Sequence, residues 1–186
     1  TGVQNTLIGG LAGDAITTGN YNVAVGDNSL GSNTTAASNT AVGQASLQNN
    51  TTGATNTALG RNALQLNTTA SNNTAVGYAS LGVNTTGTFN TAVGALAGDA
   101  LTTASYNVAL GYLALSTETA GQESVAIGSQ ALATQNVGSG AVYNTAVGTS
   151  AGRLITTALE NTLIGGLAGD AITTGNSNTA VGKSAL

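Results

Sequence analysis

The chain has 186 residues, of which 41% are apolar and only 5% are charged, and its formal net charge is −4. Its only basic residues are Arg61, Arg153 and Lys183, so it lacks the basic surface that nucleic acids and anionic membranes require. It also has no histidine, the commonest general base in enzymes, and no apolar run long enough to span a bilayer. We therefore expect no nucleic-acid partner, no membrane insertion, no cofactor and no enzymatic activity.

One unit recurs along the whole chain, and we number it from the Asn of "NTAVG", which is position 0. A fixed period of this length is typical of solenoids. The sequence therefore predicts a single repeat array over residues 1–186. Because the chain starts and stops within a unit, we expect it to be a slice of a longer fibre. The units begin at Asn5, Asn22, Asn39, Asn56, Asn73, Asn90, Asn107, Ser124, Asn144, Asn161 and Asn178, spaced by 17 residues except for 20 between Ser124 and Asn144.

Positions 1 to 3 of each unit, "TAV" in the commonest form, are rich in β-branched residues and predict a short strand. Position 4, directly after this strand, is glycine in every unit. A residue without a Cβ is needed where the backbone takes a positive φ or where two chains approach closely, so this column predicts a structural corner. The corner glycines are Gly9, Gly26, Gly43, Gly60, Gly77, Gly94, Gly111, Gly128, Gly148, Gly165 and Gly182.

Position 8 is leucine in seven units and glycine in the other four. Where it is glycine, position 11 becomes aliphatic, as at Leu101, whereas neighbouring leucine-type units carry asparagine there, as at Asn84. This exchange predicts one buried slot in every unit, which is filled from either of two places along the coil.

The "NTT" segment at positions 11 to 13 predicts a second short strand. We therefore expect an all-β parallel β-solenoid, or β-roll, of about eleven turns, each with two strands and two corners. Identical residues would then stack in register, giving an asparagine ladder and files of threonine such as Thr34 and Thr51. The ladder asparagines are Asn5, Asn22, Asn39, Asn56, Asn73, Asn90, Asn107, Asn144, Asn161 and Asn178.

Each turn offers about two aliphatic side chains for burial, whereas ordering 17 backbones costs on the order of 17 to 34 kcal/mol. A single thin coil is therefore expected to fill its core poorly. This consideration favours several chains packed side by side.

The segments "SVAIGSQALA" at 124–133 and "NTAVGQASL" at 39–47 resemble the head repeats of trimeric autotransporter adhesins. The "NTAVGxxAL" pattern is also similar to repeats of bacteriophage tail fibres. The resemblance implies a left-handed, trimeric β-roll displayed outside the cell or on a virion and used for attachment. A cell-surface glycan or protein is then the implied receptor.

These observations leave three functions open. The first is a structural and adhesive fibre segment, with any specific site in the irregular loop around 133–143. The second is a filament of head-to-tail solenoids that has no receptor. The third is ice binding by the threonine file at position 12, which includes Thr34, Thr51, Thr68 and Thr85.

Two smaller motifs have competing interpretations. Asp14, Asp99 and Asp170 share position 9, where a carboxylate binds a cation or caps a tight turn with its own side chain; we favour the cap and expect no metal site. The Asn-Thr-Thr sequons, such as that at Asn50, match glycosylation acceptors, but ladder packing explains them more simply.

Overall fold

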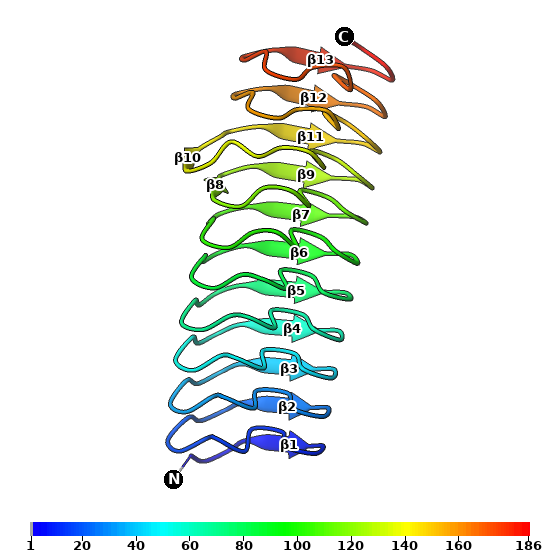
Figure 1. Ribbon diagram of the computed structural model, residues 1–186. Coiled ribbons are helices and arrows are strands. Elements are labelled where there is room, and N and C mark those ends of the chain that lie inside the picture. Colours follow the sequence, from blue (N-terminus) through cyan, green and yellow to red (C-terminus); the bar gives the residue numbers. More distant parts are fainter. Residues whose placement is uncertain (1) are drawn as a thin grey trace.

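The computed structural model describes residues 2–186 and shows a parallel β-solenoid whose turns stack into one column (Figure 1). Each turn contributes one three-residue strand to an eleven-stranded parallel sheet. The strands of this sheet are β1 (Thr6–Ile8), β2 (Val23–Val25), β3 (Thr40–Val42), β4 (Thr57–Leu59), β5 (Thr74–Val76), β6 (Thr91–Val93), β7 (Val108–Leu110), β9 (Val125–Ile127), β11 (Thr145–Val147), β12 (Thr162–Ile164) and β13 (Thr179–Val181).

The register of this sheet follows the repeat, because each residue pairs with the residue at the same unit position one turn away. Ala75, for example, pairs with Ala92. Between β9 and β11 the same rule holds although the unit is longer, since Val125 pairs with Thr145. The three extra residues are therefore accommodated outside the sheet, and the predicted solenoid is confirmed.

The prediction of a second strand in every turn is wrong. Residues at positions 12 and 13 form bends, and the turns are linked there through one acceptor carbonyl, such as Thr68 O, which accepts from Thr51 N at 2.8 Å and Thr52 N at 3.3 Å. A bend ends the extended run before a ladder can develop. The exception is a two-stranded parallel sheet of β8 (Gly121–Gln122) and β10 (Gly140–Ala141), which lies beside the three-residue insertion.

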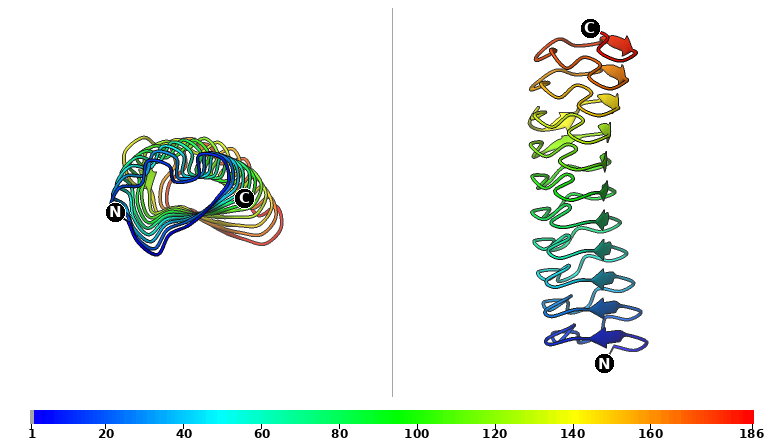
Figure 2. Two further views of the ribbon diagram at one scale, coloured as in Figure 1. Left: turned by 90° about the horizontal axis from the view of Figure 1, so that it is seen from below. Right: turned by 90° about the vertical axis from the view of Figure 1, so that its right-hand side faces the viewer.

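The core lies inside a single coil. Leucines at position 8, such as Leu47 and Leu64, and alanines at position 2, such as Ala58, are completely buried. The expectation that one chain would fill its core poorly is therefore not met, because small side chains allow the opposite walls of each turn to approach closely. Seen along the axis in Figure 2, the turns superpose as a narrow, slightly drifting stack.

The two-place filling of the buried slot is also confirmed. Leu101 and Ile155 at position 11 are fully buried in glycine-type units. A Cβ added at Gly98 would lie 3.0 Å from Leu101 Cδ1 and 3.1 Å from Leu81 Cδ2, so the glycine leaves the room that the position-11 leucine occupies. Leu163, at position 2, reaches the same volume, because a Cβ on Gly169 would lie 2.7 Å from Leu163 Cδ2.

Candidate functional site

The corner glycines form a continuous column of close backbone contacts. All eleven have φ between 125° and 138°, a region that is essentially restricted to glycine. A Cβ at Gly43 would lie 2.6 Å from the carbonyl oxygen of Gly60 in the next turn, and a Cβ at Gly77 would lie 2.5 Å from that of Gly94. Both the dihedral angle and the lack of space therefore require glycine at this corner.

The asparagines at position 0 form a ladder inside the coil. Asn39 donates its backbone amide to Asn22 Oδ1 at 3.0 Å, and its Nδ2 donates across the turn to the Gly53 carbonyl at 2.9 Å. Asn56 repeats this pattern with Asn39 Oδ1 at 2.9 Å. Each side chain therefore joins two neighbouring turns and also closes its own turn, which satisfies polar groups that burial would otherwise leave unpaired.

A second asparagine ladder lies at position 11. Asn50 Nδ2 donates to Asn33 Oδ1 at 2.9 Å and to the Gly53 carbonyl at 2.9 Å, and Asn67 and Asn84 continue the series. These side chains are fully buried. The glycosylation sequons therefore place their amide nitrogens in the core, where no glycan can be attached to the folded chain.

Sequence reasoning missed a buried polar cluster where this second ladder is interrupted. Glu118 occupies position 11 and is completely buried. Its Oε1 accepts from the backbone amides of Thr119, Ala120 and Gly121 at 2.8 to 3.2 Å. Three backbone donors converge on this oxygen, so the carboxylate is solvated by the chain rather than by a cation.

Gln135 completes this cluster in the next turn. Its Nε2 donates to Glu118 Oε2 at 3.2 Å and to Ser124 Oγ at 3.0 Å, and its Oε1 accepts from Asn144 Nδ2 at 2.9 Å. Gln135 therefore bridges the gap that Ser124 leaves in the position-0 ladder. Each residue occurs once in its column, so only the breaks in the two asparagine columns could have indicated the cluster.

Asp99, at position 9, carries a carboxyl group that is partly buried. Desolvation by burial raises the pKa of its carboxyl group, and a hydrogen bond from its own backbone amide opposes this. Its Oδ1 is buried without a hydrogen-bond partner among residues 2–186. The same residues contain no group of three or more carboxylates that could hold a metal ion.

We expect replacement of Asp99 by asparagine to stabilise the fold at neutral pH. Because the folded pKa is raised, the ionised carboxylate costs stability above this pKa, and the cost disappears below the unfolded value of 3.8. The midpoint of urea unfolding should therefore be higher for Asp99→Asn than for the wild type at pH 7 and equal at pH 3. The control is Asp14→Asn, at the same position but exposed, which should behave as the wild type at both pH values. A gain that persists at pH 3 would contradict this assignment.

The threonine file at position 12 is engaged by the backbone. Thr51 Oγ1 donates to the Thr68 carbonyl at 3.0 Å, and Thr68 Oγ1 donates to the Thr85 carbonyl at 3.1 Å. Thr34 makes the same contact to Thr51 at 3.3 Å. Since these hydroxyl protons already have acceptors in the next turn, they are unavailable to order external water.

The outer face of the eleven-stranded sheet is uncharged, and it pairs a mostly threonine column with an aliphatic one. In every strand the middle residue is buried, or exposed only at the first turn, while positions 1 and 3 face outward. Position 1 is threonine or valine and position 3 is valine, isoleucine or leucine. Leu59 and Ile164 are 46% and 42% exposed. Sequence reasoning had identified these columns without assigning them to the outside.

The edge formed by position 16 carries most of the aromatic side chains. Tyr21, Phe89, Tyr106 and Tyr143 are all about half exposed. The rings of Phe89 and Tyr106 stack with centroids 5.1 Å apart and planes 3° from parallel. The hydrogen bond to Glu123, the charge of the same carboxylate, partial burial and the charge of Glu160 together raise the pKa of the Tyr143 phenol.

No protein-family model, curated protein or solved structure matches this chain. Residues 2–186 contain no helix long and apolar enough to cross a membrane. Three features present side chains outward in long regular rows, namely the sheet face, the position-16 edge and the position-13 threonines. Of these, only the sheet face has an aliphatic column and only the position-16 edge has a row of aromatic side chains.

Proposed function

We propose that this chain is a rigid segment of an extracellular or virion fibre, in which three copies pack side by side and support attachment to a surface. The main support for this proposal is the outer face of the eleven-stranded sheet. It runs over all eleven strands, its position-3 side chains are aliphatic throughout, and neither outward column contains a charged residue. A continuous row of partly exposed aliphatic side chains is typical of surfaces that associate.

Two further observations support the same function. The core is filled within one coil, so the outward aliphatic column is available to contact another chain. Buried asparagines link most pairs of neighbouring turns, and Gln135 bridges the break at Ser124, which makes the coil stiff along its axis. Stiffness and a continuous lateral contact are the properties that a spacer in an attachment fibre needs. The number three follows from the resemblance to adhesin heads.

The solution mass of the segment tests this function. By light scattering we expect a discrete species near three times 17.8 kDa, with short rods in electron micrographs. Replacing Val42 and Val93 by lysine places a charge on the sheet face at two separated strands and should reduce the mass to that of one chain. The matched control replaces Thr35 and Thr86, which are exposed at position 13, by lysine and should leave the mass unchanged.

Other masses would overturn the proposal. A single species of 17.8 kDa for the unaltered chain would remove the three-chain fibre, and long polymers would replace it with a head-to-tail filament. Ice binding by the position-12 file is disfavoured, because those hydroxyls donate to backbone carbonyls.

A further inference from the structure

The position-16 edge combines conformational strain with exposure, which is an uncommon combination for aromatic residues. Every residue of this column has a left-handed backbone with φ between 55° and 63°, a conformation that glycine and asparagine adopt far more readily than aromatic residues. Asparagine, which this column carries at Asn72, is one of the residue types that adopt this conformation most readily. Tyr106 and Tyr143 nevertheless occupy it while remaining 54% and 57% exposed.

Neither a favoured backbone conformation nor full burial therefore explains why aromatic residues stand at these positions. Half-exposed aromatic rings are enriched where proteins recognise ligands. The stack of Phe89 on Tyr106 also holds two rings in fixed positions before any ligand arrives, which lowers the entropic cost of binding.

Hydrogen-bonding groups continue the same row beyond the stack. In successive turns after Tyr106 the column carries Glu123, Tyr143, Glu160 and Ser177. Ser177 Oγ donates to Glu160 Oε2 at 3.0 Å, and the neighbouring Glu123 carboxylate raises the pKa of the Tyr143 phenol. The contact with Ser177 orients Glu160, and both carboxylates retain lone pairs that can accept hydrogen bonds from outside the protein.

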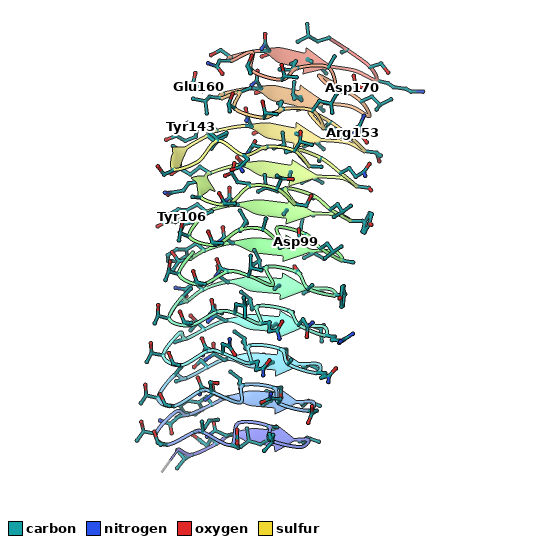
Figure 3. All side chains as sticks on the ribbon, viewed as in Figure 1. Asp99, Tyr106, Tyr143, Arg153, Glu160 and Asp170 are labelled. Atoms are coloured by element: carbon teal, nitrogen blue, oxygen red, sulfur yellow. The ribbon has the colours of Figure 1, made fainter. Side chains whose placement is uncertain are left out.

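The charge around this row excludes one class of ligand. The three basic residues lie at other unit positions, Arg61 and Lys183 at position 5 and Arg153 at position 9. Figure 3 shows Arg153 at the opposite edge of the coil from Tyr106, Tyr143 and Glu160. An acidic ligand would therefore meet two carboxylates and no compensating cation.

The three-residue insertion lies directly beside the same rungs. β10 pairs with β8. β10 ends at Ala141, two residues before Tyr143, and β8 ends at Gln122, one residue before Glu123. Ser139, Gly140 and Ala141 are exposed, and a Cβ at Gly140 would meet no atom within 4 Å. The exposed residues of the insertion therefore lie next to Glu123 and Tyr143 in the position-16 row.

We propose that the position-16 edge from Phe89 to Ser177 binds a neutral polysaccharide that lies along the fibre axis. Aromatic rings offer contacts to the apolar C–H faces of pyranose rings, and the carboxylates and Ser177 accept and donate hydrogen bonds to sugar hydroxyls. A chain-like ligand fits because the row repeats once per turn at about 4.8 Å. This inference rests on the proposed attachment function but not on the three-chain assembly.

Affinity electrophoresis tests the proposal with named probes. The protein is run in native gels that contain a mixed-linkage β-glucan, a galactomannan, a dextran or, as the acidic comparison, alginate. We expect retardation by at least one of the three neutral polymers and none by alginate. The absence of retardation in all three neutral gels, or equal retardation by alginate, would overturn the proposal.

Residue replacements locate the binding surface. Tyr106→Asn and Tyr143→Ser introduce residue types that the column already accepts at Asn72 and Ser177, so the fold should be retained. Each should weaken binding by about tenfold, as expected for the loss of one stacking contact. The control is Tyr112→Ala. Tyr112 is 52% exposed at position 5, where Ala95 stands one unit earlier, so affinity should stay within about twofold.

The same samples separate this proposal from the assembly proposal. An equal loss of affinity in Tyr112→Ala and Tyr106→Asn would show that binding does not depend on the position-16 edge. Light scattering on each variant reports the chain number independently. A monomer that still binds the polysaccharide would remove the three-chain fibre and keep this site, and a trimer without binding would do the reverse.

Discussion

Replacing Gly165 by alanine is expected to destabilise the C-terminal turns by roughly 2 to 6 kcal/mol, the sum of backbone strain and a steric clash. The new Cβ would lie 2.4 Å from the Gly182 oxygen and 2.6 Å from its carbonyl carbon, at a φ of 135°. Hydrogen exchange of amides in β12 and β13 measures this effect, because opening of these turns should become much more frequent.

The neighbouring residue supplies the matched control. A Cβ at Gly166 would meet only the Thr149 carbonyl oxygen at 3.9 Å, and its φ is not in the positive region. Gly166→Ala therefore makes the same chemical change one residue away without strain or clash, and its exchange pattern should match that of the wild type. Similar protection in Gly165→Ala and Gly166→Ala would show that the corner tolerates a side chain.

Leu81→Gly and Asn84→Leu together convert one way of filling the buried slot into the other. We expect their effects on the free energy of unfolding to be strongly coupled. Leu81→Gly alone removes a fully buried side chain and should cost about 2 to 5 kcal/mol. Asn84→Leu alone adds bulk to a filled core and removes the donor to Asn67 Oδ1, which should cost about 2 to 5 kcal/mol.

Together the two changes convert this unit to the type seen at Gly98 and Leu101, and most of the stability should return. The number of unpaired ladder oxygens stays the same, because Asn84 Oδ1, which is unpaired in the wild type, is replaced by Asn67 Oδ1. Urea unfolding of the wild type, both single variants and the double variant measures the coupling. Additive losses would contradict the idea of one slot shared by positions 8 and 11.

The sequence was most informative where residues repeat. The period, the corner column and the shared slot could all be deduced by comparing units within one chain, since each unit reports on the same local environment. The orientation of position 3 could not be deduced in this way. A three-residue strand alternates in and out, but valine at positions 1 or 3 and alanine at position 2 do not reveal which side is the core.

Backbone conformation and unique residues were the least predictable features. Leucines at position 8, such as Leu47 and Leu64, have φ near 49°, although leucine normally avoids this region. Asparagines in the left-handed columns, Asn62 at position 6 and Asn72 at position 16, were the available signal. "NTT" suggested a strand from its composition, whereas the observed bends arise from inward ladder contacts by the asparagine.

The cluster of Glu118 and Gln135 has a consequence for how the chain finds its correct alignment during folding. Almost every turn offers its neighbour the same asparagine, alanine and glycine contacts, so a pairing that skips one turn would lose little energy. Glu118 Oε2, however, needs Gln135 Nε2 and the Val137 amide, which donates at 3.0 Å, and no other turn supplies this pair. A skipped turn at this point would leave a buried carboxylate short of donors, which is strongly unfavourable. The one irregular unit thus favours the correct pairing of turns in a chain whose other turns could pair in several registers.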